Sequence, residues 1–395
     1  MKNIFLITLT LFCILAFVGC NKNDEQTNSE DKTNSNVSNI SVNENSSDTE
    51  PSTEIKVEEY IEVNVFSVNG LVEENEIIPQ NSRYGYILNK YDLLQLNDTE
   101  KDNKFVLVEA EYVNSLSADE KTEFTDHLKD EFSKNKKIYI YGKQEALSRE
   151  FMFDILDLIC PFEIDPVNES DYTDLVALSI ETDDMGAITV TDYLHESKSS
   201  DTVIDDIGYI LSVNEGRSYS VNDEKDIKAE EQLPEYRFIQ ANDCSTMLTV
   251  FSVQITFIEE HPEQALWEAV IAADIQAKGA YKNERVQLGH APYQFEQSNA
   301  DGNNIILAEY WPTESSEPDI KIYTKSCMCN DNETYFEFFE NKRSNQREMV
   351  ESGAKWAVMQ GDFMATCHGT FAVNSFSSEN LWDIKCAGYH INVKE

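Results

Sequence analysis

The chain has 395 residues, of which 41% are hydrophobic and 11% aromatic, enough to build large hydrophobic cores. Its formal net charge of −42 argues against two classes of partner. Nucleic acids and anionic membrane surfaces are bound by charge through Lys and Arg that face phosphates, so a strongly acidic chain is a poor candidate for either. An acidic surface instead favours solubility, and it suits divalent cations or a basic partner.

The first 20 residues have the pattern of a secretory signal. Lys2 supplies a positive start, and an apolar stretch follows over residues 4–18, interrupted by Thr8 and Thr10. This stretch is shorter than the about 20 apolar residues that a transmembrane helix needs. The small residue Gly19 then stands directly before Cys20.

Residues 15–20, Leu-Ala-Phe-Val-Gly-Cys, resemble the lipobox of bacterial lipoproteins, with Phe17 where the family usually has Leu. The resemblance implies a signal peptide over residues 1–19, cleavage before Cys20 and an acyl lipid, such as palmitate, on Cys20. The protein would then be anchored to the cell membrane at the cell surface, facing outside the cytoplasm. Two or more acyl chains anchor durably, since each buried CH₂ contributes about 0.8 kcal/mol. An ordinary cleaved signal followed by a chance cysteine is the alternative.

Residues 20–57 are predicted to be a disordered tether that carries the lipidated cysteine. Over residues 21–54 the sequence is rich in Asn, Ser, Thr, Glu and Asp, has no aromatic residue, and offers only Val37, Ile40 and Val42 as apolar side chains. Such a composition cannot bury enough surface to offset the entropy of ordering. As a coil, its ends would lie about 30 Å apart, with a stretched limit of about 110 Å.

Residues 58–233 are predicted to form an α/β domain. Ile61, Val63 and Val65 alternate with polar residues, as in a strand. Ser117 and Glu120 form a capping box that opens a helix. Strands and helices alternate after it, which indicates a partly parallel sheet. Further predicted strands cover residues 104–112, 137–141, 175–180, 188–193 and 207–213, and predicted helices cover residues 117–134 and 144–159.

Residues 234–395 are predicted to form a β-rich, sandwich-like domain after the charged run 222–234. Apolar residues alternate from Met247 to Phe257 and again from Trp267 to Ala277, so residues 246–278 read as a long hairpin, because a helical period gives a poorer apolar stripe. The predicted fold class is α+β, an N-terminal α/β unit followed by this β-rich unit. Further predicted strands cover residues 293–296, 305–310, 319–324, 334–339, 365–373 and 387–393, and a short helix covers residues 342–350.

Six cysteines remain after the signal is removed and Cys20 is lipidated, and an exported protein permits disulfides between them. A zinc site is disfavoured, because Cys367 and His368 would point to opposite faces of a strand, and Cys386 and His390 would lie about 13 Å apart. We therefore predict no metal and no cofactor. Cys327 and Cys329 are poorly spaced to bond each other. The disulfide candidates are Cys244, Cys327, Cys329, Cys367 and Cys386, with Cys160 as the sixth cysteine.

No catalytic motif identifies an active site, since G-x-S-x-G, H-E-x-x-H and a Gly-rich phosphate loop are absent from the sequence. Gly142 and Lys143 follow a predicted parallel strand, where α/β proteins often bind ligands, but a plain strand-to-helix turn is enough to explain them. The acidic pairs Asp183-Asp184 and Asp205-Asp206 are treated as solvated rather than as calcium ligands. The loop 299–304, which contains Asp301-Gly302, is predicted to be a hairpin turn.

Three functions remain open. The first is a membrane-anchored binding or interaction module, more plausibly not an enzyme, with an unidentified protein or ligand partner and no nucleic acid. The second is an extracytoplasmic hydrolase with unidentified acidic catalytic residues, which two facing carboxylates of shifted pKa would favour. The third is a pore-forming or membrane-active protein that uses the hairpin 246–278, each arm of which is long enough to cross a bilayer.

Overall fold

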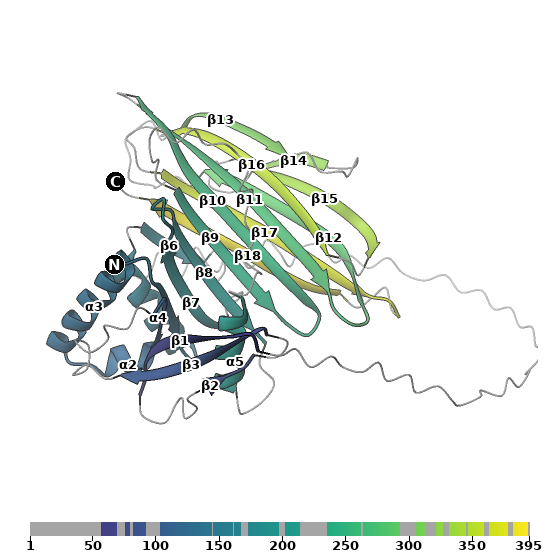
Figure 1. Cartoon of the computed structure of the whole chain (residues 1–395). Helices are drawn as coiled ribbons and strands as arrows, with labels where there is room; N and C mark the ends of the chain where they lie inside the picture. Colours follow the sequence, from purple (N-terminus) through teal and green to yellow (C-terminus); the bar gives the residue numbers. More distant parts are fainter. Residues whose placement is uncertain are drawn as a thin grey trace, which may run out of the picture. The chain divides into compact units, whose positions relative to one another are not determined.

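The computed structural model describes 16 segments of the chain. Within them, strands greatly outnumber helices (Figure 1). All of them lie in one compact unit, residues 54–395. The described segments are residues 57–68, 76–79, 82–91, 103–143, 145–160, 162–166, 173–196, 202–213, 235–261, 264–292, 305–312, 321–326, 332–344, 347–358, 363–377 and 382–393.

A mixed sheet of 12 strands is the main feature of the fold. Its strands lie in the order β13-β16-β11-β10-β9-β8-β7-β5-β4-β1-β3-β2. Strands β3, β1, β4, β5, β8 and β9 all run in the same direction, with β7 antiparallel between β5 and β8. In sheet order the strands span Ile305–Pro312, Glu348–Val358, Gln264–Ala277, Met247–His261, Glu235–Asp243, Ile188–His195, Leu175–Thr182, Lys137–Tyr141, Phe105–Glu109, Glu59–Phe66, Tyr84–Tyr91 and Glu76–Ile77.

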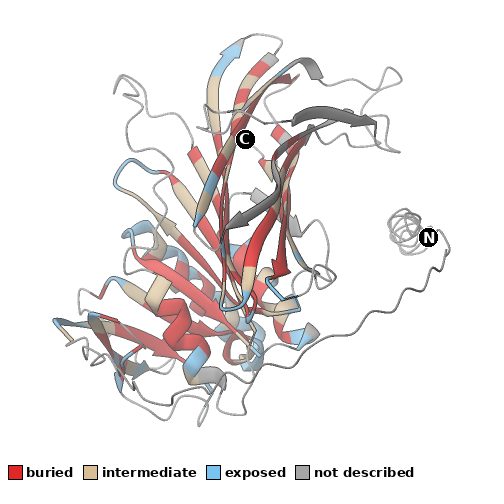
Figure 2. Cartoon of the chain, turned by 90° about the vertical axis from the view of Figure 1, so that its right-hand side faces the viewer, coloured by how far each residue is buried: buried red, intermediate tan, exposed pale blue. Residues whose placement is uncertain are grey.

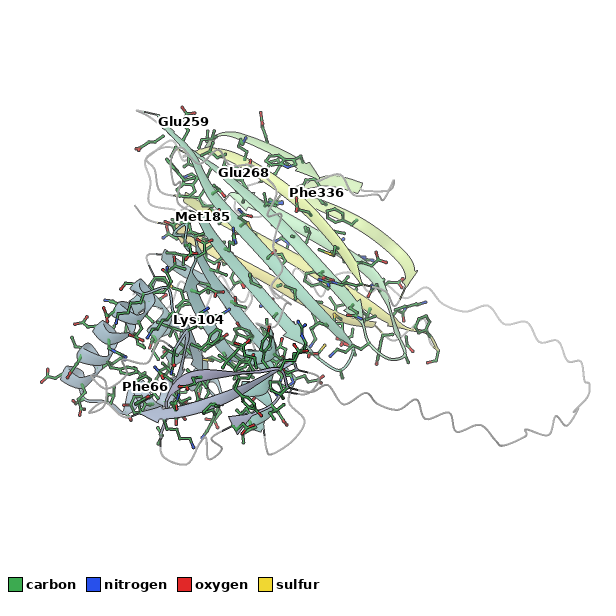
Figure 3. The ribbon with its side chains drawn as sticks, in the orientation of Figure 1. Phe66, Lys104, Met185, Glu259, Glu268 and Phe336 are labelled. Carbon is green, nitrogen blue, oxygen red and sulfur yellow. The ribbon has the colours of Figure 1, made fainter. Side chains whose placement is uncertain are left out.

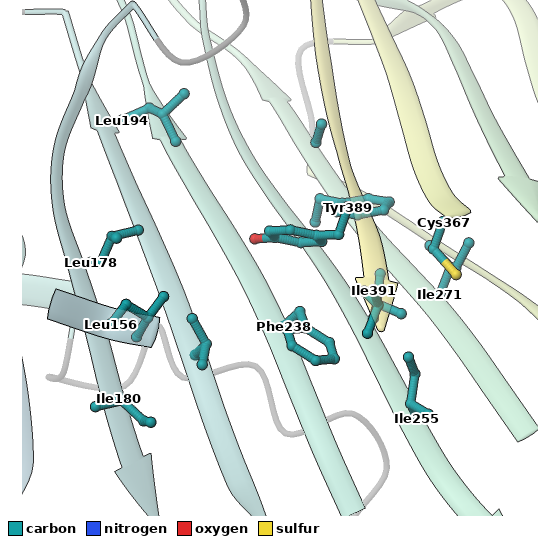
Figure 4. Close-up of a cluster of buried hydrophobic side chains, with 14 of the residues drawn as sticks. Leu156, Leu178, Ile180, Leu194, Phe238, Ile255, Ile271, Cys367, Tyr389 and Ile391 are labelled. Atoms are coloured by element: carbon teal, nitrogen blue, oxygen red, sulfur yellow. The ribbon is translucent and has the colours of Figure 1, made fainter. Parts of the chain in front are cut away.

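A second sheet of 6 strands, in the order β14-β15-β12-β17-β18-β6, packs on the half of the large sheet that holds β9, β10 and β11. Phe238 and Tyr389 meet across the two sheets with ring centroids 5.7 Å apart, and Figure 4 shows them among the surrounding core side chains. Trp267 and Phe363 stack at 5.1 Å. In sheet order the strands span Lys321–Ser326, Asn332–Ser344, Tyr281–Pro292, Phe363–Ser375, Trp382–Val393 and Phe162–Pro166.

The predicted fold class, an α/β unit followed by a separate sandwich-like unit, is wrong. Strands β8 and β9 pair in parallel from Ile188↔Tyr236 to His195↔Asp243, so one sheet runs through both predicted units. Strand β6 also leaves the first unit to pair with β18. Sequence periodicity could not reveal these pairings, because it shows which side chains share a face and not which strand lies alongside. The domain boundary at residue 233 stays a prediction, and the run 222–234 lies outside the described residues.

Helices cover both faces of the β1–β8 part of the sheet. Helices α2, α3 and α4 bury one face, which carries Val106 and Val108 of β4, whereas α5 buries the other face with Leu107 and Tyr139. Figure 2 shows that the buried residues concentrate in the strands, with exposed residues on the outer helix surfaces and turns. The helices span Ala110–Ser115, Ala118–Ser133, Ala146–Ile159 and Thr202–Ser212.

The capping box at the start of α3 is confirmed, since the Ser117 backbone N–H donates to Glu120 Oε2 at 2.9 Å. Three other local predictions are wrong. The strand predicted over 104–112 ends at Glu109, where α2 takes over, and the strand predicted over 207–213 lies in helix α5. In place of the helix predicted over 342–350, residues 342–344 belong to β15 and residues 348–350 belong to β16.

The long hairpin is confirmed as strands β10 and β11, paired from Met247↔Ala277 to His261↔Gln264. A register shift lies between Phe257 and Glu259. Both strands are central in the sheet, because β9 pairs with β10 and β16 pairs with β11. A pore-forming rearrangement of this hairpin would have to break both outer ladders. Among the described residues, no helix is both long and apolar enough to cross a membrane.

Candidate functional site

The carboxyl ends of β1 and β4 form a topological switch point. The chain passes from β1 to β3 on one side, then returns to β4 and β5 on the other side, and all four strands are parallel. The connections therefore leave β1 and β4 in opposite directions. In open α/β sheets, ligands bind outside the carboxyl ends of the strands at such a point.

Glu109, the last residue of β4, ties the two strand ends together. Its side chain is buried, and its Oε2 accepts a hydrogen bond of 2.6 Å from the Val68 backbone N–H just after β1. Phe66, the last residue of β1 (labelled in Figure 3), packs against Phe124 of α3 with ring centroids 5.0 Å apart. Burial raises the pKa of Glu109, and the neighbouring Glu111 carboxylate raises it further, while the Val68 N–H and the Lys143 charge act in the opposite direction.

Glu111, in the first turn of α2, reaches α4. Its Oε1 accepts a hydrogen bond from Ser148 Oγ. Its Oε2 is buried and has no hydrogen-bond partner among the described residues. Ser148 comes close because the β5–α4 turn contains Gly142, where an added Cβ would lie 3.1 Å from Ser148 Cβ. The small residue thus lets the turn pack tightly on the first turn of α4.

Tyr141, the last residue of β5, lies directly opposite Glu109 in the parallel ladder, so both side chains stand on the same face. Tyr141 is only 2% exposed, and the Ser67 side chain just after β1 is the hydrogen-bond partner beside its hydroxyl. Burial raises the pKa of Tyr141, as do the charges of Glu109 and Glu111, whereas the hydrogen bond with Ser67 acts in the opposite direction.

We refer to Glu109, Glu111, Tyr141 and Ser148 as the carboxylate cluster. Buried polar atoms in proteins are nearly always hydrogen-bonded, so Glu111 Oε2 lacks a described partner that a ligand could supply. A carboxyl of raised pKa such as Glu109 can also donate a proton. Across the described part of the chain, no group of three or more His, Cys, Asp and Glu side chains is placed to hold a metal ion.

The sequence drew attention to this edge through Gly142 and Lys143, which follow β5 as predicted. It did not single out Glu109, Glu111 or Tyr141. A usable signal was present, because Glu109 and Tyr141 end two strands that were predicted to be parallel. This signal was missed because the strand was predicted to continue to residue 112, so no strand end was expected at Glu109.

The disulfide candidates are only partly described. Cys20, Cys327 and Cys329 lie outside the described residues. Cys367 points into the core, whereas Cys386 is opposite Thr370, three residues further along β17, and therefore points to the other face of the sheet. Cys244 lies in the turn before β10, and among the described cysteines no disulfide is formed. Disulfides that involve Cys327 or Cys329 stay a prediction.

One residue of each acidic pair has a partner within the protein, so the prediction that the pairs are solvated is wrong for Asp183 and Asp206, whereas Asp184 and Asp205 are exposed. Asp183 Oδ1 accepts hydrogen bonds of 2.9 Å from the backbone N–H groups of Met185 and Ala187, and so closes the β7–β8 turn. Asp206, on α5, lies 2.6 Å from the ring of His195. Both contacts fit structural roles, and the loop 299–304 lies outside the described residues.

Comparisons with known proteins give no relative from which a function could be transferred. No family model matches the chain, and no curated protein matches it. A solved structure titled "AvmM Catalyzes Macrocyclization in Alchivemycin A Biosynthesis" has 7% identity and a TM-score of 0.19, and the match covers 35% of this chain and 87% of that one. Another, titled "Pore forming protein", has 7% identity and a TM-score of 0.17, with 40% and 89% covered. Similarities this low carry no argument about fold or function.

Proposed function

We propose that the protein is a lipid-anchored binding protein that faces outside the cytoplasm and holds its ligand at the carboxylate cluster. The observation that carries the binding site is Glu111 Oε2, buried without a described partner next to the switch point between β1 and β4. The raised pKa of the neighbouring Glu109 supports the same assignment. A ligand group that donates to Glu111 Oε2 would supply the hydrogen bond that its burial leaves unmade.

A matched pair of glutamate variants tests the site. Ligands from a small-molecule library are first found through the rise in melting temperature that binding produces. We expect Glu111→Gln to abolish that rise, and Glu123→Gln, on the exposed side of α3, to retain it. If every such ligand binds Glu111→Gln as well as the native protein, the binding site lies elsewhere.

The anchor is tested at Cys20, the residue that the lipobox resemblance implies is lipidated. We expect the native chain to incorporate labelled palmitate and to fractionate with membranes, and Cys20→Ala to lose both properties. Cys13→Ala, within the predicted signal peptide, is the matched control and should behave as the native chain. Absence of label, together with retention of Cys20→Ala on membranes, would show that the chain is not a lipoprotein.

A hydrolase is the second candidate, because Glu109 has a raised pKa and lies close enough to Glu111 for their charges to interact. In this role Glu109 would donate a proton to a leaving group, and Glu111 would act as the base. Glu109→Gln would then lower kcat on glycoside or ester substrates by about 10²-fold or more. No turnover of either substrate class by the native protein would remove this candidate.

A further inference from the structure

We propose that the outer face of strands β13, β16 and β11 binds an uncharged pyranose sugar, which stacks on the ring of Trp311. This site goes beyond the proposed function, because it is separate from the carboxylate cluster. Strand β13 is the edge strand at one end of the 12-stranded sheet, whereas β4 and β5 lie in its other half.

The ring of Trp311 lies flat on the sheet, over a glycine of the neighbouring strand. Trp311 of β13 pairs with Gly353 of β16, and a Cβ added to Gly353 would meet the indole at Cε2 first, then at Cζ2 and Nε1, both at 2.6 Å. Cζ2 and Nε1 flank Cε2 on the rim of the indole, so an edge-on ring would bring them closer than Cε2. The ring therefore turns one face to the Gly353 backbone, a close approach that glycine permits, and its other face away from the sheet.

This side of the strands is the outer one. Ala354 and Trp356, which alternate with Gly353 and Lys355 along β16, are buried in the core that the two sheets share. Gly353 and Lys355 therefore point outward, as does Trp311, which lies opposite Gly353. Trp311 is partly exposed. The outward face of its indole is the surface on which a ligand can stack.

A row of charged side chains borders the indole. Glu309 of β13, Lys355 of β16 and Glu268 of β11 (labelled in Figure 3) lie side by side in the ladder, one strand apart. Lys355 Nζ lies 3.6 Å from Glu268 Oε2 and 6.0 Å from the centroid of the Trp311 ring. The row is two residues along the strands from Trp311 and Gly353, at a distance of about 7 Å. We call Trp311, Gly353 and this row the indole platform.

The indole platform complements both the face and the rim of a pyranose ring. The C–H groups on one face of a pyranose carry partial positive charge, and the face of an indole is negative, so the two surfaces attract each other. The hydroxyls at the rim of the sugar both donate and accept hydrogen bonds. Glu309 and Glu268 supply acceptors and Lys355 supplies a donor, and hydrogen bonds to charged groups are the stronger ones.

Charge disfavours the other groups that stack on an indole. Lys355 already lies 6.0 Å from the ring centroid, within reach of a cation–π contact, and would repel an arginine or lysine of a partner protein. The two glutamates would repel a phosphate or carboxylate ligand, including a nucleotide that stacked through its base. An uncharged ligand with many hydroxyls avoids both repulsions.

Saturation-transfer difference NMR of the full-length chain tests the proposal. The probes are the methyl glycosides of glucose, galactose, mannose and N-acetylglucosamine, each in both anomeric forms. We expect saturation to reach at least one of them, most strongly at the C–H protons of the sugar face that contacts the indole. Trp311→Ala should weaken binding of that sugar about tenfold or more, and Trp311→Phe should retain part of it, because the smaller ring keeps a stacking face.

Three further variants locate the site. Gly353→Ala should weaken binding about as much as Trp311→Ala, because the added methyl group displaces the ring. Met349→Ala, on the same outer face of β16 with its side chain 65% exposed, is the matched control and should bind normally. Glu111→Gln should also bind the sugar normally, which separates this site from the carboxylate cluster. Circular dichroism of each variant distinguishes lost binding from lost folding.

Three results would overturn the proposal. The first is the absence of saturation transfer to every glycoside. The second is equal transfer in the native chain, Trp311→Ala and Met349→Ala, which would place the sugar elsewhere on the protein. The third is binding of tetra-arginine that is lost in Trp311→Ala, with no binding of any glycoside, which would replace the sugar by a basic protein partner.

Discussion

His195, the last residue of β8, links the sheet to helix α5. Its Nδ1 lies 2.6 Å from Asp206 Oδ1, and its ring stacks on Tyr209 with centroids 4.8 Å apart. Burial lowers the pKa of His195, but the hydrogen bond and charge of Asp206, with the charges of Asp243 and Asp205, outweigh burial and leave the pKa raised. The charged pair therefore stabilises the docking of α5 on the sheet.

Asp206→Asn should destabilise the protein by about 1 kcal/mol at pH 6 and by much less at pH 9. A folded-state pKa above the unfolded value means that the stabilisation is complete below about pH 6.5, and is lost as pH rises through the folded-state pKa. Urea unfolding of the native chain and the variant across this range measures the difference. The control is Asp205→Asn, at an exposed neighbour that lacks the hydrogen bond, and it should lose less stability. If the stability lost in Asp206→Asn does not change with pH, the charged pair is not the source of the stabilisation.

At the residue scale, the sequence could indicate where the candidate site lies but not what it contains. Gly142 and Lys143 mark the end of a parallel strand, which is a property of strand order along the chain. The pairing of Glu109 with Tyr141 depends on the register of two strands separated by two helices. The contact of Glu111 with Ser148 depends on how α2 and α4 pack. Neither the strand register nor the helix packing can be predicted from the local period of apolar residues.

At the scale of elements, predictions succeeded where the alternation of apolar residues continued over many positions. The hairpin of β10 and β11 offered six alternating apolar positions in its second arm, and both arms form the paired strands that were predicted. The segment 207–213 offered only a short apolar run, which periodicity alone cannot assign to a strand or a helix. In the structure it belongs to α5, where Ile207, Ile210 and Leu211, spaced three and four residues apart, are buried on one side.

Two glycines give opposite predictions for the same substitution. Gly208→Ala, in α5, should stabilise the fold by about 1 kcal/mol, because alanine favours helix and its Cβ would meet only Ile77 Cγ2 at 3.8 Å. Gly369→Ala, in β17, should destabilise the fold by about 1–3 kcal/mol, because its Cβ would lie 2.8 Å from Phe371 and 3.0 Å from Phe251 of the facing sheet. Urea unfolding of both variants checks the pair. A loss of stability in Gly208→Ala would argue against helix α5.

At the scale of the whole molecule, the continuous sheet predicts a single cooperative unfolding transition for the folded region. Strands β8 and β6 belong to the first predicted domain, and they pair with β9 and β18 of the second. Each predicted domain therefore completes a sheet of the other. Residues 58–233 alone would expose the edge of β8 and leave β6 without its sheet, and both edges would favour aggregation. Urea unfolding followed by far-UV circular dichroism and by tryptophan fluorescence measures this cooperativity. Every tryptophan of the chain lies after residue 233, so fluorescence reports on the second predicted domain, and we expect the two transitions to coincide. Two separate transitions would instead support a domain boundary near residue 233.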